Sequence, residues 1–179
     1  FALGYSKDKI INTFYTSNKY SYNKETKSWI TEFNLENYRR PITLTYDLTD
    51  AKNNKIILKK GEKLNIVIAK KLKEKGLDTI AIPNEQIIGS YLGKEIKDKN
   101  GELLVGAGFD ITEEQLEKII SNEIKELEIV NIDLINKGPY ILETIKIDKN
   151  SNKTEALNDI YKVLRPGEAP STEIAEEIF

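Results

Sequence analysis

The chain has 179 residues, of which 39% are hydrophobic and 31% charged, and its formal net charge is −2. This length and composition indicate a globular chain that can form one domain or two small ones. A uniformly basic nucleic-acid binder is excluded, so any contact with DNA must come from a local patch. Cysteine and histidine are both absent, which excludes disulfides, Cys/His zinc sites, thiol nucleophiles and histidine-based triads. No run of about 18 apolar residues occurs, so we expect no membrane partner.

The N-terminal part predicts a short helix followed by strands. Residues 1–15 have a capping serine at Ser6 and apolar side chains at helical spacing behind it. The following residues to 37 are rich in aromatic and β-branched side chains, and the polar stretch 23–27 is typical of a hairpin loop. Alternating apolar and polar side chains over 42–46 predict a further strand.

The middle of the chain contains an internal repeat with an offset of 47 residues. Segments 53–84 and 100–131 align without a gap, and each predicts a strand, a glycine turn, a capped helix and a second strand. Asn65 and Thr112 are the expected N-caps, and Thr112 with Gln115 fits a capping box. Duplication explains the ten matched positions better than two generic units that are similar by chance. One copy is too small to bury its own apolar stripe, so we expect both copies to face each other across a pseudo-twofold axis in one β-rich, half-barrel-like core.

The C-terminal part predicts one strand and two helices. Gly138-Pro139 forms a turn pair, and 140–147 alternates roughly between apolar and polar residues, which favours a strand. Thr154 is the expected cap of a helix that ends at Arg165, because the residue before a proline disfavours the helical region. Ser171 or Thr172 is expected to cap a second helix.

Three motifs could carry chemistry, and each has a simpler structural interpretation. Gly106-Ala107-Gly108 precedes a helix but is not followed by Lys-Ser/Thr, so it indicates a tight turn rather than a phosphate-binding loop. Paired acids could act as general acid and base, but solvated faces and helix dipoles explain them: Glu113-Glu114, Glu126 with Glu128, and Glu176-Glu177. The lysine run at 70, 71, 73 and 75 could bind nucleic acid or another acidic partner, yet it is more typical of the solvated face of a helix.

Arg165 is one of only three arginines, at a helix end just before a Pro-Gly turn. A guanidinium at this place can contact phosphate or a base edge in forked geometry. It can also cap its own helix, as the dipole favours, and the residues alone favour that second interpretation.

Several motifs at both ends of the chain carry a family resemblance. They are Ala2-Leu3-Gly4-Tyr5, Gly138-Pro139-Tyr140-Ile141, Thr144-Ile145-Lys146-Ile147-Asp148, Ala156-Leu157, Ile160-Tyr161 and Arg165-Pro166-Gly167-Glu168-Ala169-Pro170-Ser171. The string resembles the lobe region of the β subunit of bacterial DNA-directed RNA polymerases, which has ALGY, GPYI, TLRVD, AL, IY and RPGEPPT at the same spacing. The family often has proline where Ala169 stands and valine where Ile147 stands.

The resemblance implies an α+β fragment in which a mostly helical lobe flanks a lineage-specific inserted domain. Its implied divisions are 1–15 and 137–179 for the lobe and 16–136 for the insertion. The implied function is DNA-templated RNA synthesis in the bacterial cytoplasm by the whole nucleotidyltransferase, with the fragment forming one wall of the downstream DNA channel and carrying a surface domain that docks regulators. By the same resemblance, Arg165, and with it Lys162, contacts non-template DNA.

The resemblance also implies partners and a cofactor outside the fragment. Other polymerase subunits (β′, α and ω), a sigma factor and DNA are the implied partners. The catalytic Mg²⁺ is implied to be held by another subunit, so we expect no catalytic residue and no cofactor in this chain. Two alternatives stay open from the residues alone: a free-standing interaction module built on the duplicated unit, and a small carboxylate-dependent hydrolase. The absence of methionine and the C-terminal Glu177-Ile178-Phe179 lead us to expect an excised fragment.

Overall fold

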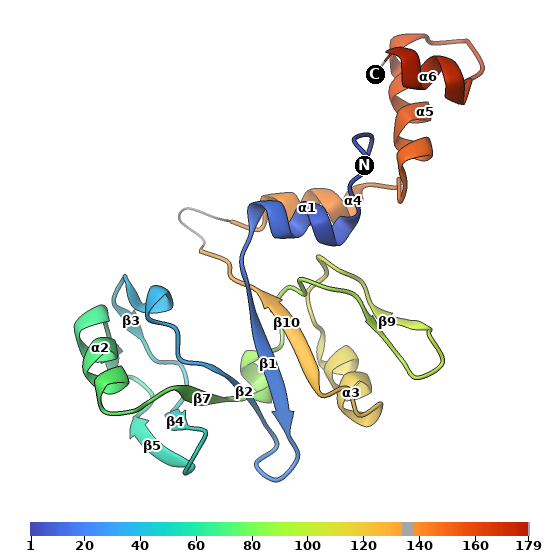
Figure 1. Cartoon of the computed structure of the whole chain (residues 1–179). Coiled ribbons are helices and arrows are strands. Elements are labelled where there is room, and N and C mark those ends of the chain that lie inside the picture. Colours follow the sequence, from blue (N-terminus) through green and yellow to red (C-terminus); the bar gives the residue numbers. More distant parts are fainter. Residues whose placement is uncertain (134–137, 179) are drawn as a thin grey trace.

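The computed structural model describes residues 1–133 and 138–178, and its centre is a six-stranded antiparallel sheet (Figure 1). The strands run in the order β10-β1-β2-β7-β4-β5. They are β1 (Ser17–Asn23), β2 (Ser28–Glu32), β4 (Leu48–Asp50), β5 (Lys55–Leu58), β7 (Thr79–Pro83) and β10 (Glu126–Val130). Two small sheets pair β3 (Ile42–Thr43) with β6 (Lys63–Leu64) and β8 (Ile96–Lys97) with β9 (Leu103–Val105).

Helices cover and flank this sheet, which confirms the α+β class. The α-helices are α1 (Lys7–Phe14), α2 (Ile66–Glu74), α3 (Glu113–Ser121), α4 (Tyr140–Ile147), α5 (Lys153–Leu164) and α6 (Thr172–Ile178). Short 3₁₀ turns occur at η1 (Leu35–Tyr38) and η2 (Asn84–Gln86). Within the described part of the chain, none of these helices has the length and apolar character needed to cross a membrane.

In the sheet, the β1–β2 hairpin lies between β7 of the first repeat copy and β10 of the second. Tyr20 pairs with Thr31 across the hairpin, Leu127 of β10 pairs with Tyr20, and Ile80 of β7 pairs with Thr31. Ile80 and Leu127 are the same position of the repeat, 47 residues apart. The register is therefore symmetric about a point between Tyr20 and Thr31, as a pseudo-twofold axis requires.

Each copy forms the expected elements around its helix. The first copy supplies β5, β6, α2 and β7, and the second supplies β9, α3 and β10. The Asn65 side chain accepts from the Ile68 amide, and Thr112 and Gln115 form the predicted capping box. Ser6 caps α1 as predicted by accepting from the Lys9 amide.

Backbone conformation repeats with the same offset of 47 residues. The first copy has positive φ at three positions, Asn54 (55°), Gly61 (90°) and Gly76 (95°). The second copy has positive φ at the matching positions, Gly101 (87°), Gly108 (80°) and Glu123 (59°). Left-handed backbone disfavours most side chains, so this match reflects the same turns in both copies.

Both copies contribute to one hydrophobic core. The buried side chains include Leu64, Ile80 and Ile82 from the first copy and their counterparts Ile111, Leu127 and Ile129 from the second. Trp29 of β2 is fully buried in the same cluster. The two apolar stripes are thus buried together, as expected from their size.

Helices α1 and α4 lie side by side and pack against the second copy (Figure 1). Their buried side chains Ile11, Leu142 and Ile145 cluster with Ala107 and Val130. The segments that precede and follow the repeats in the chain are also joined directly, because the Tyr15 hydroxyl donates a 2.7 Å hydrogen bond to the Gly138 carbonyl.

The predicted strand over 140–147 is wrong, because this segment is helix α4. Leu142 and Ile145 lie on one side of a helix and are buried against α1, whereas Ile147 is 79% exposed. Over only eight residues the apolar pattern fits both the helical and the strand period, and packing against α1 selects the helix. The next helix begins earlier than predicted, with Asn152 rather than Thr154 as its cap, and strand β3 covers only Ile42–Thr43. The predicted boundary at 136–137 lies outside the described residues.

Candidate nucleic-acid interface

Helices α5 and α6 form a hairpin that stands away from the sheet (Figure 1). Its small apolar cluster consists of Leu157, Tyr161 and Ala175, with Ala2 from the N-terminal segment packed against it. Helix α5 ends at Leu164, and its C-cap is Arg165, whose amide donates a 2.8 Å hydrogen bond to the Tyr161 carbonyl. The predicted end of this helix just before Pro166 is thus confirmed.

Arg165 is held by the turn that follows α5. Its Nη1 lies 3.5 Å from Glu168 Oε2, and the same oxygen accepts a 2.8 Å hydrogen bond from the Tyr161 hydroxyl. The guanidinium carbon also lies 5.9 Å from the centre of the Tyr161 ring. The Tyr161–Glu168 hydrogen bond raises the pKa of the tyrosine. Since the arginine side chain is 48% exposed and a guanidinium has five donors, further donors remain for a phosphate.

Lys162 lies one turn before Arg165 and is also exposed. Its Nζ is 3.1 Å from Asp159 Oδ1, and this contact lowers the pKa of the aspartate. The two candidate DNA-binding residues are therefore close together at the end of α5. Each has a carboxylate beside it, so their local charges are largely offset and any phosphate must compete with Asp159 and Glu168.

The turn at Gly106-Ala107-Gly108 forms backbone hydrogen bonds within the chain, among them one from the Phe109 amide to the Gly106 carbonyl. Gly108 adopts a φ of 80°, and its amide donates to the Leu92 carbonyl at 2.7 Å. Its Cα also lies close to α1, because a Cβ built there would be 3.3 Å from Ile11 Cδ1. The structure thus confirms a tight turn, and this turn positions the second copy against the helices.

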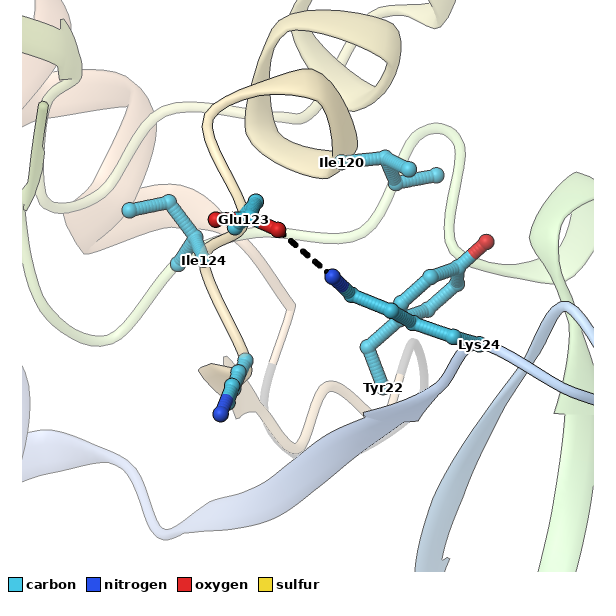
Figure 2. A pocket seen from close by; sticks show the side chains of 6 residues that line it. Tyr22, Lys24, Ile120, Glu123 and Ile124 are labelled. Atoms are coloured by element: carbon cyan, nitrogen blue, oxygen red, sulfur yellow. Dashed lines mark hydrogen bonds and ion pairs between the residues drawn. The ribbon is translucent and has the colours of Figure 1, made fainter.

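A shallow pocket of about 350 Å³ lies between the β1–β2 hairpin and the end of α3 (Figure 2). The Lys24–Glu123 ion pair crosses it at 2.6 Å, and Lys99 lies 3.1 Å from the same carboxylate. Hydrogen bonds from Lys24 and then Lys99 lower the pKa of Glu123 to about 2. A carboxylate with such a pKa is a poor general base, so the pocket does not support catalysis.

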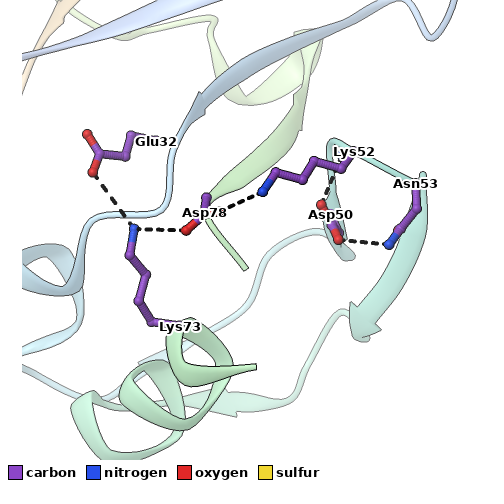
Figure 3. A network of polar contacts seen from close by, with 6 residues as sticks. All are labelled: Glu32, Asp50, Lys52, Asn53, Lys73 and Asp78. Carbon is purple, nitrogen blue, oxygen red and sulfur yellow. Dashed lines mark hydrogen bonds and ion pairs between the residues drawn. The ribbon is translucent and has the colours of Figure 1, made fainter. Parts of the chain in front are cut away.

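A second polar network joins β2, α2 and the start of β7 (Figure 3). Asp78 contacts Lys52 at 2.6 Å and Lys73 at 3.7 Å, and Lys73 lies 3.8 Å from Glu32. The hydrogen bond from Lys52 lowers the pKa of Asp78. Lysines thus separate the carboxylates, which does not favour an acid–base pair. Among residues 1–133 and 138–178, no group of three or more acids is placed to hold a metal ion.

One polar cluster was not predicted from the sequence. Lys146 of α4 lies 2.6 Å from Asp110 and 3.1 Å from Glu143, and Glu143 accepts a 2.6 Å hydrogen bond from Tyr91. Partial burial alone would lower the pKa of Lys146, but the hydrogen bonds to Asp110 and Glu143 outweigh it and raise the pKa. We call these four residues the α4 clamp. The three-residue spacing of Glu143 and Lys146 was the available signal, and it is visible only if 140–147 is taken as a helix.

Several known proteins that are similar to this chain carry the same name, DNA-directed RNA polymerase subunit beta. No family model matches the chain. The chain is 38% identical over 179 residues to the DNA-directed RNA polymerase subunit beta of Ehrlichia canis, covering 99% of the chain and 13% of that protein. The subunit beta of Rhizobium leguminosarum bv. trifolii is 36% identical with the same coverage. That of Cereibacter sphaeroides is 35% identical over 193 residues, covering 100% of the chain and 14% of that protein. The chain therefore spans only 13–14% of the length of these relatives.

Proposed function

The chain corresponds over its whole length to a segment of the bacterial DNA-directed RNA polymerase β subunit, and we propose that it works as part of that subunit in DNA-templated transcription. The similarity to the named β subunits across 99–100% of the chain is the observation that carries this proposal. The activity of the whole enzyme is nucleotidyl transfer in the cytoplasm, with the β′, α and ω subunits and a sigma factor as partners. The Mg²⁺ of the reaction is held by another subunit, and this segment supplies no catalytic residue.

Within that subunit, residues 1–15 and 137–179 belong to the lobe and 16–136 form an inserted domain. The pairing of α1 with α4 supports this division, because it brings together two helices that are far apart in sequence. The hydrogen bond between Tyr15 and Gly138 supports it as well, since an insertion must leave and return at neighbouring points.

The lobe part forms a wall of the downstream DNA channel, with Arg165 and Lys162 toward the non-template strand. The exposure of both cations and their closeness at the end of α5 support this role. The adjacent carboxylates predict that these contacts contribute modestly and mainly through phosphate charge. The inserted domain presents its outer surface to proteins that regulate transcription.

The test uses polymerase assembled with a β subunit that carries this segment, in wild-type form and as Arg165→Ala. Arg39→Ala is a matched control, because Arg39 is also exposed and paired three residues away, with Glu36. We expect Arg165→Ala alone to weaken binding to forked promoter DNA and to reduce the slope of log K against log salt by about 1.

Two results would contradict parts of this proposal. Equal binding by Arg165→Ala and wild type would leave Arg165 as a helix-end residue paired with Glu168. A β subunit carrying this segment that fails to assemble with the other subunits, although the segment itself is folded, would overturn the placement in the polymerase.

A further inference from the structure

The two repeat copies share their helix positions and left-handed turns but have opposite charge. Segment 53–84 contains eight lysines and three carboxylates, whereas 100–131 contains two lysines and eight carboxylates. Helices α2 and α3 lie at different ends of the sheet in Figure 1. The inserted part is therefore strongly dipolar, although the net charge of the whole chain is only −2.

The charge of the first copy is concentrated on the outer face of α2. Val67, Lys70 and Lys71 are three or four positions apart, so they lie side by side on one face, and Lys75 follows at the C-cap. All four are exposed, and Val67 is 58% exposed despite being apolar. In the described part of the chain, no carboxylate lies within ion-pair distance of the three lysines, whereas Lys73 is paired with Glu32 and Asp78.

This face is fixed in orientation by the opposite side of the helix. Ala69 is fully buried, and Ile68 and Leu72 pack against the common core. Helix α2 is capped by Asn65 and packs against η1. A partner would thus meet a preformed surface and would not have to order it, which lowers the entropic cost of binding.

The second copy shows that the fold does not require every residue of this face. Val67 corresponds to Glu114, Lys70 to Glu117 and Lys71 to Lys118, each 47 residues later on α3. Glu114 and Glu117 are exposed on a helix of the same length. Val67 and Lys70 of α2 are therefore not demanded by folding, whereas Lys71 has a lysine at the matching position.

We propose that the outer face of α2, formed by Val67, Lys70, Lys71 and Lys75, docks an acidic segment of another protein. The unpaired lysines attract the acids of that segment, and an apolar side chain of the partner covers Val67. A protein partner fits better than nucleic acid, since the lysines adjoin an exposed aliphatic side chain and no aromatic residue of α2 offers a base a stacking surface. This inference rests on the docking role proposed above for the inserted domain and names the partner chemistry.

The test measures binding of the 179-residue chain to a labelled synthetic 20-residue amphipathic helix rich in glutamate and leucine, by fluorescence anisotropy. Lys71→Glu is compared with Lys118→Glu, which makes the same charge change at the matching position of α3. We expect Lys71→Glu to weaken binding about tenfold and Lys118→Glu less than about twofold. Val67→Ser, which keeps the charge, is expected to weaken binding several-fold.

Other outcomes would overturn the inference. Equal losses for Lys71→Glu and Lys118→Glu would show attraction by net charge only. Tighter binding to a 20-base-pair DNA duplex than to the peptide, with loss in Lys71→Glu, would make the face a nucleic-acid surface. Absence of peptide binding by a folded wild-type chain would reject the docking face. None of these results changes the expected effect of Arg165→Ala on the assembled polymerase, so the two proposals fail separately.

Discussion

The two copies of the repeat show which features of this fold are obligatory and which are free to change. Their cores match, because Leu64 and Ile111 are both fully buried at the same position. Their turns match as well, since all three left-handed positions recur. Their surfaces differ: the first copy is basic and the second acidic. Burial and backbone conformation therefore constrain both copies alike, while the charge of the exposed positions differs.

The copies also differ in what they touch. The second copy packs against α1 and α4 through Ala107, Gly108 and Asp110, and the α4 clamp joins it to Lys146. The first copy has an ion network around Asp78 instead, and the outer face of its helix is open. The second copy is thus the end of the repeat region that is attached to α1 and α4, and the first copy is the end that does not contact them.

The strongest test of whether the two copies share one core removes one buried side chain from each copy. Leu64→Ala and Ile111→Ala should each lower the free energy of unfolding by about 3 kcal/mol, because each leaves a cavity in the same core. Urea unfolding followed by the fluorescence of Trp29, the single tryptophan, measures both. Leu103→Ala, at a side chain that is 58% exposed, is the control and should change stability by less than about 0.5 kcal/mol. If one core variant left the Trp29 transition unchanged, the two copies would not share a core.

The matching glycine turns give the next largest effect. Gly61→Ala should cost about 1–2 kcal/mol from left-handed backbone alone, since a Cβ there meets nothing within 4 Å. Gly108→Ala should cost more, because its Cβ would also press on Ile11 of α1. Asn54→Gly is the control and should not destabilise, as the matching residue is Gly101. Equal costs at Gly61 and Gly108, measured by urea unfolding, would argue against close packing of α1 on the second copy.

The elements that the two copies share could be predicted from the sequence, because helix caps, turns and apolar periodicity are local signals. The gapless repeat gave the elements of both copies, and Asn65 and Thr112 gave their caps. Helix α4 could not be predicted, since its eight residues fit two periods and only contact with α1 selects one. The position of the β1–β2 hairpin on the symmetry axis could not be predicted either. The same holds for the α4 clamp, because it joins residues that are far apart in the sequence, such as Tyr91, Asp110 and Lys146. The positions of Arg165 and Lys162 at the end of α5 were predictable from Pro166, and their contact with DNA stays a prediction.

The α4 clamp tests the attachment of the second copy. Lys146→Met keeps most of the side-chain volume but removes the ion pairs to Asp110 and Glu143, which should cost about 1 kcal/mol. Hydrogen exchange should then speed up at amides of α4 with little change at β2 and β7, where the core is shared. Lys153→Met is the control, because Lys153 pairs with Glu176 in the separate α5–α6 hairpin. Unchanged exchange in α4 would show that apolar packing alone holds the helix.

The smallest expected effect concerns the left-handed position where a glycine of the first copy is matched by a charged residue of the second. Gly76 of the first copy is replaced by Glu123, which keeps a φ of 59° and pairs with Lys24 and Lys99. Glu123→Gly should relieve backbone strain but lose both ion pairs, so the opposing effects nearly cancel at low salt. In high salt the pairs are screened, and the variant should be slightly more stable than wild type.

The pH dependence separates the two contributions of Glu123. Its pKa is lowered from 4.5 to about 2 in the folded chain, so its ion pairs stabilise the fold above pH 4.5 and this contribution is lost as the pH falls toward 2. Wild type should therefore lose more stability than Glu123→Gly between these pH values, as measured by urea unfolding at low salt. Glu102→Gln, a charge-neutralising change at another exposed acid of the second copy, controls for general charge effects. Parallel pH curves for wild type and Glu123→Gly would mean that the lysines do not hold this carboxylate, and that the strained turn is kept for another reason.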